Sequence, residues 1–212
     1  AKWLIPLRWL ILTIAILAGL LGNHWLGNVL PARSLWVALV AVAGYNGAFA
    51  LVALRLTKEG APHTSHVWLV NAQVIADLCA LTVVLHFTGG LENPFAMYYL
   101  LLVVVGSILM GRRAAYAYAG LATALWLGPL LLEAADVLPH YGLAGFRSPL
   151  RYRQATQIVA EGVVVGTSSF CLAYLCSVIM GRLREGERRL IENMADTGVS
   201  TDELTRVNAR LQ

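Results

Sequence analysis

The chain has 212 residues, of which 58% are hydrophobic and only 13% are charged, and its net charge is +4. A soluble domain carries about a quarter charged residues, so this composition excludes an ordinary soluble protein and favours a membrane protein. The modest positive charge is explained by lysines and arginines near the ends of apolar segments, so no nucleic-acid partner is expected.

Six apolar stretches have the length of transmembrane helices, because about 20 apolar residues cross the hydrocarbon core. Helices satisfy their own backbone hydrogen bonds in lipid, so we predict an all-α bundle of six transmembrane helices. The first stretch lacks a small-residue cleavage site and is expected to be a span, not a signal peptide. The predicted spans are Leu4–Leu21, Leu35–Leu56, Val67–Phe87, Phe95–Met110, Ala114–Leu132 and Ala155–Met180.

The distribution of positive charge predicts the orientation, because lysine and arginine collect on the cytoplasmic side of membrane proteins. If the N-terminus is cytoplasmic, most of the 16 lysines and arginines lie inside, and the only outer ones are Arg33, Arg147, Arg151 and Arg153. Both termini are therefore predicted to be cytoplasmic, and the connection between the third and fourth spans faces outward.

That connection, TGGLENPF at Thr88–Phe95, has two interpretations. Glycine ends helices, asparagine caps them and proline suits a first turn, which together predict a plain helical hairpin. However, Glu92, Phe95, His86 and Tyr98 lie close together in sequence, and the start of the fourth span offers free N–H groups. Such a site suits a flat, weakly polar ring that carries acceptor oxygens.

Two acids lie within predicted spans, where an ionisable residue is a functional-site hypothesis by default. Asp77 is near the middle of the third span, and Gln73 lies one turn earlier on the same face. We favour a hydrogen-bonding role, with Gln73 or a neighbouring helix as the partner, over a ligand or proton role. Glu161 in the sixth span is expected within reach of Arg151 or Arg153.

The five histidines and three cysteines show no spacing that is diagnostic of a metal site. His86 with His24 or His140 is the conceivable haem pair, but water-exposed histidines are the favoured interpretation. The sequence contains no nucleophile–base motif, P-loop or dinucleotide fingerprint, so no metal site and no catalytic residue is predicted.

The chain becomes polar at its C-terminal end, which divides it into a transmembrane domain at 1–181 and a cytoplasmic helical linker at 182–212. Leucines recur at seven-residue spacing in this linker, which is typical of a two-stranded coiled coil and predicts a homodimer. A solvated helix without a partner is the alternative. Gly198 is expected to interrupt the helix within Asp196–Ser200. The leucines are Leu183, Leu190, Leu204 and Leu211.

The stretch DLCALTVVLHFTGGLENPFAMYYLL, which begins at Asp77, resembles the RegB/PrrB family of redox-responsive sensor histidine kinases. GGLENPF matches the family's GGxxNPF heptapeptide, which is implicated in binding ubiquinone. The resemblance implies that the quinone is bound at Gly89, Gly90, Asn93, Pro94 and Phe95, with Glu92 at a variable position.

The resemblance also implies a place for the chain in a two-component system of the bacterial inner membrane. The quinone pool would tune an ATP-dependent histidine kinase that acts on a cytoplasmic response regulator. The phosphoacceptor histidine and the ATP-binding domain have no counterpart here, so we expect the kinase core to be absent from this chain.

Two other classes of function remain open at this point. One is a small proton-coupled transporter or membrane enzyme that uses Asp77 and Glu161. Paired broken helices would support a transporter, and the sequence shows no such symmetry. The other is a membrane anchor whose hairpin binds no ligand. The sequence also leaves open whether a quinone lies at the turn or deeper, beside Asp77.

Overall fold

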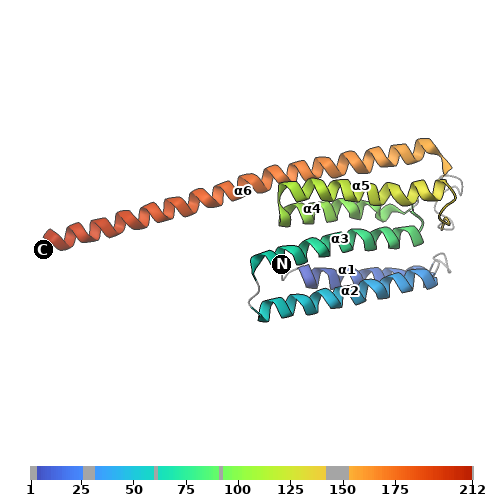
Figure 1. Ribbon diagram of the computed structural model, residues 1–212, viewed down its shortest axis with the longest axis horizontal. Helices are drawn as coiled ribbons and strands as arrows, with labels where there is room; N and C mark the ends of the chain where they lie inside the picture. Colours follow the sequence, from blue (N-terminus) through green and yellow to red (C-terminus); the bar gives the residue numbers. More distant parts are fainter. Residues whose placement is uncertain (1–3, 26–31, 60–61, 91–92, 142–152, 212) are drawn as a thin grey trace.

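The computed structural model describes residues 4–25, 32–59, 62–90, 93–141 and 153–211, which form six α-helices and no strand. Consecutive helices run in opposite directions along one bundle (Figure 1). A short 3₁₀ helix, η2 at Pro94–Met97, precedes α4. The all-α, six-helix prediction is confirmed. The helices are α1 Leu4–Trp25, α2 Ala32–Lys58, α3 His63–Phe87, α4 Tyr98–Met110, α5 Arg112–Ala134 and α6 Ala155–Leu211.

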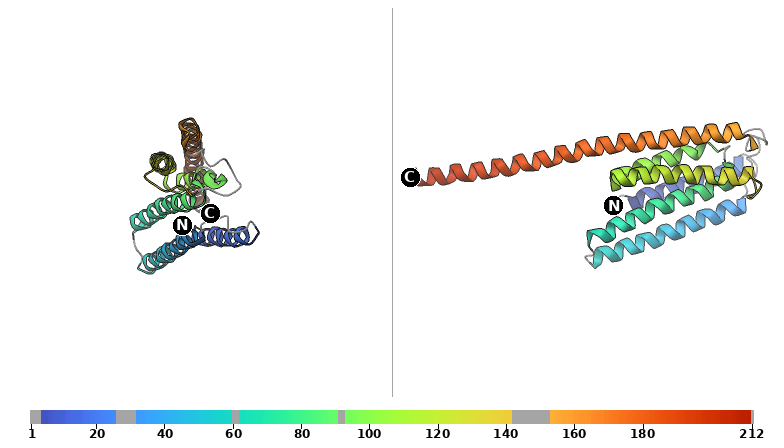
Figure 2. Two further views of the ribbon diagram at one scale, coloured as in Figure 1. Left: turned by 90° about the vertical axis from the view of Figure 1, so that its right-hand side faces the viewer. Right: turned by 45° about the horizontal axis from the view of Figure 1, so that its top comes forward.

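Helix α3 is the centre of the bundle, with α1 and α2 on one side and α4, α5 and α6 on the other (Figures 1 and 2). The larger apolar core lies among α3, α4, α5 and α6, where Leu78, Tyr99 and Ala119 are fully buried. A smaller core joins α1 to α2 through Leu12 and Leu39. Helix α3 therefore connects the half formed by α1 and α2 to the half formed by α4, α5 and α6.

Most of the outer surface is apolar, as expected for helices that face lipid. Among the described residues, four helices are long and apolar enough to cross a membrane, and the segment Phe95–Met110 is a shorter apolar helix. Large side chains such as Trp68 and Val40 are fully turned outward. Such an extended exposed apolar surface is rare on a soluble protein, so the chain is a multi-pass membrane protein.

Small residues allow two very close helix contacts in the larger core. Gly106 of α4 faces the ring of Tyr118 in α5, and Gly162 of α6 faces Leu127 in α5. A Cβ atom built on either glycine would lie 2.5–2.6 Å from the facing side chain. Helices in membranes pack through such small residues because lipid gives no hydrophobic force between them.

Helix α6 is one continuous helix of 57 residues that projects far beyond the others (Figure 1). The predicted interruption within Asp196–Ser200 is therefore wrong. A single glycine in a helix costs only about 1 kcal/mol relative to alanine, which is small enough for a helix of 57 residues to continue through it. The residues from Gly181 to Met194 are all exposed. Leu204 and Leu211 belong to the same predicted coiled-coil seam, but their side chains lie outside the described part of the structure.

Candidate functional site

The turn between α3 and η2 has the backbone that its sequence predicts. Gly89 and Gly90 have φ angles of 105° and 48°, in the left-handed region that glycine adopts most easily. Asn93 caps η2, and Pro94 occupies its first turn. The predicted site residue Glu92 lies outside the described residues.

Asn93 is buried, and its side chain holds the turn together. Its Nδ2 donates to the carbonyl oxygen of Thr88 at 2.8 Å and to Thr88 Oγ1 at 2.6 Å. Its Oδ1 accepts a hydrogen bond from the backbone N–H of Phe95 at 2.9 Å. Both amide hydrogens are used inside the turn, so Asn93 shapes the site in this structure and does not present a free donor.

The two aromatic residues predicted beside the turn face away from the bundle. Phe95 and Tyr98 are exposed, and their rings stack on each other with centroids 5.7 Å apart. Neither residue lines the hollow beside Arg8 or the hollow beside Trp126 that are described below. A ring bound at their position would therefore lie on the lipid-facing surface.

A buried carboxylate lies directly behind the turn, and the sequence analysis did not single it out. Glu133, in the last turn of α5, is 1% exposed. Its Oε1 lies 2.7 Å from His86 Nδ1, and its Oε2 lies 2.7 Å from His140 Nδ1. A Cβ built on Gly90 would be 3.5 Å from both carboxylate oxygens, so the glycine turn closes over this acid.

The two histidine side chains are only 13% and 12% exposed, so the prediction of water-exposed histidines is wrong for both. The physical reason is that Glu133 gives each ring a charged hydrogen-bond partner, which offsets the cost of burial. The one sequence signal for this cluster is an acid at the end of a long apolar run, at the same predicted depth as His86.

A hollow of about 210 Å³ adjoins the buried carboxylate, and we call it the Trp126 hollow. Its enclosed part has room for about one water molecule, so a larger ligand must displace side chains. Trp126 Nε1 is buried without a hydrogen-bond partner among the described residues. Tyr99 Oη is paired with Thr82 Oγ1 at 2.6 Å. The lining residues are Thr82, Leu85, His86, Gly90, Tyr99, Leu125, Trp126, Pro129, Leu130 and Glu133.

The second polar cluster joins the first three helices around Asp77. Arg8 Nη2 donates to Asp77 Oδ2 at 2.6 Å, and Tyr45 Oη donates to Asp77 Oδ1 at 3.0 Å. Asp77 is thus bonded by α1 and α2, and not by Gln73 of its own helix. Of the two predicted alternatives, the neighbouring-helix partner is correct.

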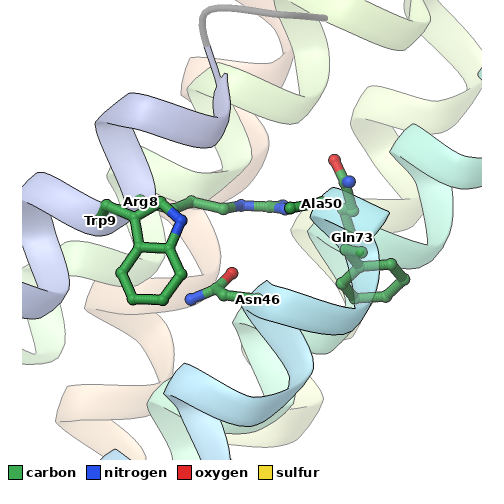
Figure 3. A pocket seen from close by; sticks show the side chains of 6 residues that line it. Arg8, Trp9, Asn46, Ala50 and Gln73 are labelled. Atoms are coloured by element: carbon green, nitrogen blue, oxygen red, sulfur yellow. The ribbon is translucent and has the colours of Figure 1, made fainter. Parts of the chain in front are cut away.

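Arg8 also borders a shallow hollow without room for an enclosed water molecule, which Figure 3 shows from close by. Its side chain extends from α1 across Asn46 of α2, and Gln73 of α3 lies on the far side. Arg8 Nε and Asn46 Oδ1 are buried without partners among the described residues. This cluster is separate from the Trp126 hollow, with which it shares no lining residue.

The remaining predicted acid takes part in neither cluster. Glu161 Oε1 accepts a hydrogen bond from Gln157 on the preceding turn of α6 at 3.1 Å. Arg153 pairs with Asp136 at 2.6 Å, and Arg151 lies outside the described residues. Within the described part of the chain, no three histidine, cysteine or acidic residues are arranged to hold a metal ion.

Comparison of the sequence with models of protein families gives a result that agrees with the observed bundle, its apolar surface and its long exit helix. Residues 2–190 match the model of the PilS-like transmembrane domain, named 6TM_PilS. The chain belongs to this family. A PilS-like domain is a membrane module of the sensor histidine kinase type, so the broader part of the sequence prediction is confirmed. Comparison with curated proteins and with solved structures finds no match.

Proposed function

We propose that this PilS-like domain is a redox-sensing module that binds ubiquinone in the Trp126 hollow. The observation that carries the proposal is the indole N–H of Trp126, which is buried and has no hydrogen-bond partner among the described residues. An unmade hydrogen bond of a buried donor is unfavourable, and a carbonyl oxygen would satisfy it. A quinone carries two such oxygens on a flat ring.

The rest of the lining suits a ring of this kind. Leu85, Leu125 and Leu130 give apolar walls, and Tyr99 and Trp126 give aromatic faces at an edge-on angle. Aromatic rings favour stacked or edge-on contacts with a flat ligand. The ring would displace lining side chains, because the enclosed part of the hollow holds only about one water molecule, and its isoprenoid tail would stay in lipid.

The turn motif that resembles the RegB/PrrB heptapeptide has a supporting role in this proposal. Gly90 lines the hollow, and Asn93 fixes the turn that places Gly90 there. Phe95 and Pro94 begin the chain segment that leads into α4 and therefore to Tyr99. The other residues assigned from the resemblance, Gly89 and Glu92, would act through the shape of the turn.

In the proposed function, ligand binding in the hollow changes the conformation of α6, which transmits the signal to the cytoplasm. Helices α4 and α5, which line the hollow, both pack along α6. A ligand shifts a conformational equilibrium only by its different affinity for the two states, so ring binding must alter this packing. The output would be a homodimeric histidine kinase in a bacterial inner membrane, with both termini cytoplasmic and a response regulator as its substrate.

The proton-coupled transporter has less support from the structure. Its two candidate acids, Asp77 and Glu161, lie on different helices and are bonded to Arg8 and to Gln157, and neither acid lines either of the two hollows described above. The ligand-free anchor gives no reason for the buried indole N–H of Trp126, which no described residue accepts.

The test measures binding of a short-chain ubiquinone to the chain in lipid nanodiscs by titration calorimetry. We expect saturable binding to the wild type. In Trp126→Phe, which keeps an aromatic side chain but loses the indole N–H, we expect the affinity to be about threefold to tenfold weaker. Trp68→Phe is the matched control, because Trp68 lies on the lipid-facing surface. Absence of saturable binding to the wild type would refute the proposal. Asn93 is unsuitable for this test because its loss would deform the turn.

A further inference from the structure

Glu133 is the one acidic residue among the described residues that line the Trp126 hollow. It is buried, and its two oxygen atoms are fixed by His86 and His140 at 2.7 Å each. A buried carboxylate is costly unless charged or hydrogen-bonded groups compensate it. The two histidines supply that compensation, so they are positioning residues that hold Glu133 beside the hollow.

The hydrogen-bonding capacity of Glu133 is not used up by the histidines. An ionised carboxylate accepts about four hydrogen bonds, two at each oxygen, and cannot donate any. Gly90 approaches both oxygens and, having no side chain, leaves the space in front of them free of a Cβ. The hollow therefore contains an acceptor-only group, Glu133, and a donor-only group, Trp126 Nε1.

We propose that Glu133 determines which redox form of the ring binds, and that it favours the quinol over the quinone. This inference rests on the proposed function, because it concerns the same hollow. A quinol hydroxyl donates its hydrogen to the carboxylate, whereas a quinone carbonyl has no hydrogen and faces the negative charge unfavourably. Trp126 acts in the opposite sense, because a carbonyl oxygen is the better acceptor for its N–H.

This arrangement gives the quinone and the quinol different affinities, which a redox sensor requires. A ring that bound equally well in both redox forms would shift no equilibrium, however tightly it bound. Hydrogen bonds to charged groups are stronger than those between neutral groups. One carboxylate and one N–H that line the same hollow thus suffice to make the two forms bind differently.

The experiment titrates short-chain ubiquinone and, under anaerobic reducing conditions, its quinol into the chain in nanodiscs. The measured quantity is the ratio of quinol affinity to quinone affinity. In Glu133→Gln the amide donates to a carbonyl, so we expect this ratio to fall about tenfold or more relative to wild type. In Trp126→Phe we expect the ratio to rise. Glu161→Gln makes the same chemical change outside the hollow and should leave the ratio unchanged.

The ratio compares two ligands on one protein preparation, so a partly unfolded variant does not mimic the result. If Glu133→Gln does not fold at all, Glu133→Asp, which withdraws the carboxylate by one methylene group, takes its place, and the ratio should again fall. An unchanged ratio in the folded Glu133 variant would overturn the role of Glu133 and leave quinone binding intact. Failure of the wild type to bind either form would overturn the proposed function itself.

Discussion

At the scale of single residues, the ion pair between Arg8 and Asp77 joins α1 to α3 within the apolar part of the bundle. Arg8 is buried, and Asp77 is additionally held by Tyr45, so three helices meet at one carboxylate. The gain from such a pair is opposed by the desolvation of both charges. What matters for the fold is therefore the loss of one partner, which leaves the other charge buried and alone.

We predict that Arg8→Met and Asp77→Leu each destabilise the protein by about 3–5 kcal/mol, and that the double variant recovers most of this loss. Thermal unfolding in mild detergent measures the effect. The control is Arg189→Met, which removes an exposed pair with Glu185 and should change the midpoint very little. If the two single losses simply add in the double variant, the ion pair is not the reason for either.

At the scale of helices, close packing between α4 and α5 depends on Gly106. A Cβ there would lie 2.5 Å from Tyr118 Cδ2 and 3.2 Å from Val74 Cγ1. The Tyr118 ring has little freedom to move aside, because its hydroxyl donates to Asn71 on α3. Overpacking of this kind forces a backbone shift rather than a change of rotamer.

We predict that Gly106→Ala destabilises the protein by about 1–3 kcal/mol, even though alanine is the better helix former. Gly47→Ala in α2 is the control, because no atom lies within 4 Å of the added Cβ. The control substitution should leave the midpoint of thermal unfolding in the same detergent unchanged or raise it slightly. Equal stabilisation of both variants would show that α4 and α5 are not tightly packed at Gly106.

The sequence was a good guide to the helices and a poor guide to their polar partners. The first five predicted spans correspond to helices within a few residues, and the sixth is the first part of the longer helix α6, because the apolar length that lipid requires is local information. The partners of Asp77 and His86 are 69 and 47 residues away in sequence, so no local pattern identifies them. Glu133 was overlooked for this reason, since its importance comes from the two histidines that enclose it.

At the scale of the whole molecule, α6 carries the chain out of the bundle. Its first half packs against α4 and α5, and its second half stands free in Figure 1. A rigid helix transmits a shift at one end to the other without a hinge, and the described helix is unbroken through Gly198. The continuity that the sequence analysis did not predict therefore favours direct transmission.

The free half of α6 also carries exposed apolar side chains, among them Leu183, Leu190 and Met194. In water such a stripe is best covered by the same stripe of a second copy, as at the seam of a two-stranded coiled coil.

We predict that Leu190→Cys, with Cys79, Cys171 and Cys176 replaced by alanine, forms an intermolecular disulfide under mild oxidation in membranes. Glu192→Cys, on the opposite side of the helix, is the control and should crosslink much less, because disulfides need Cα atoms within about 7 Å. Equal crosslinking at both positions would indicate random collision, and no crosslink at Leu190→Cys would exclude this seam as the dimer contact.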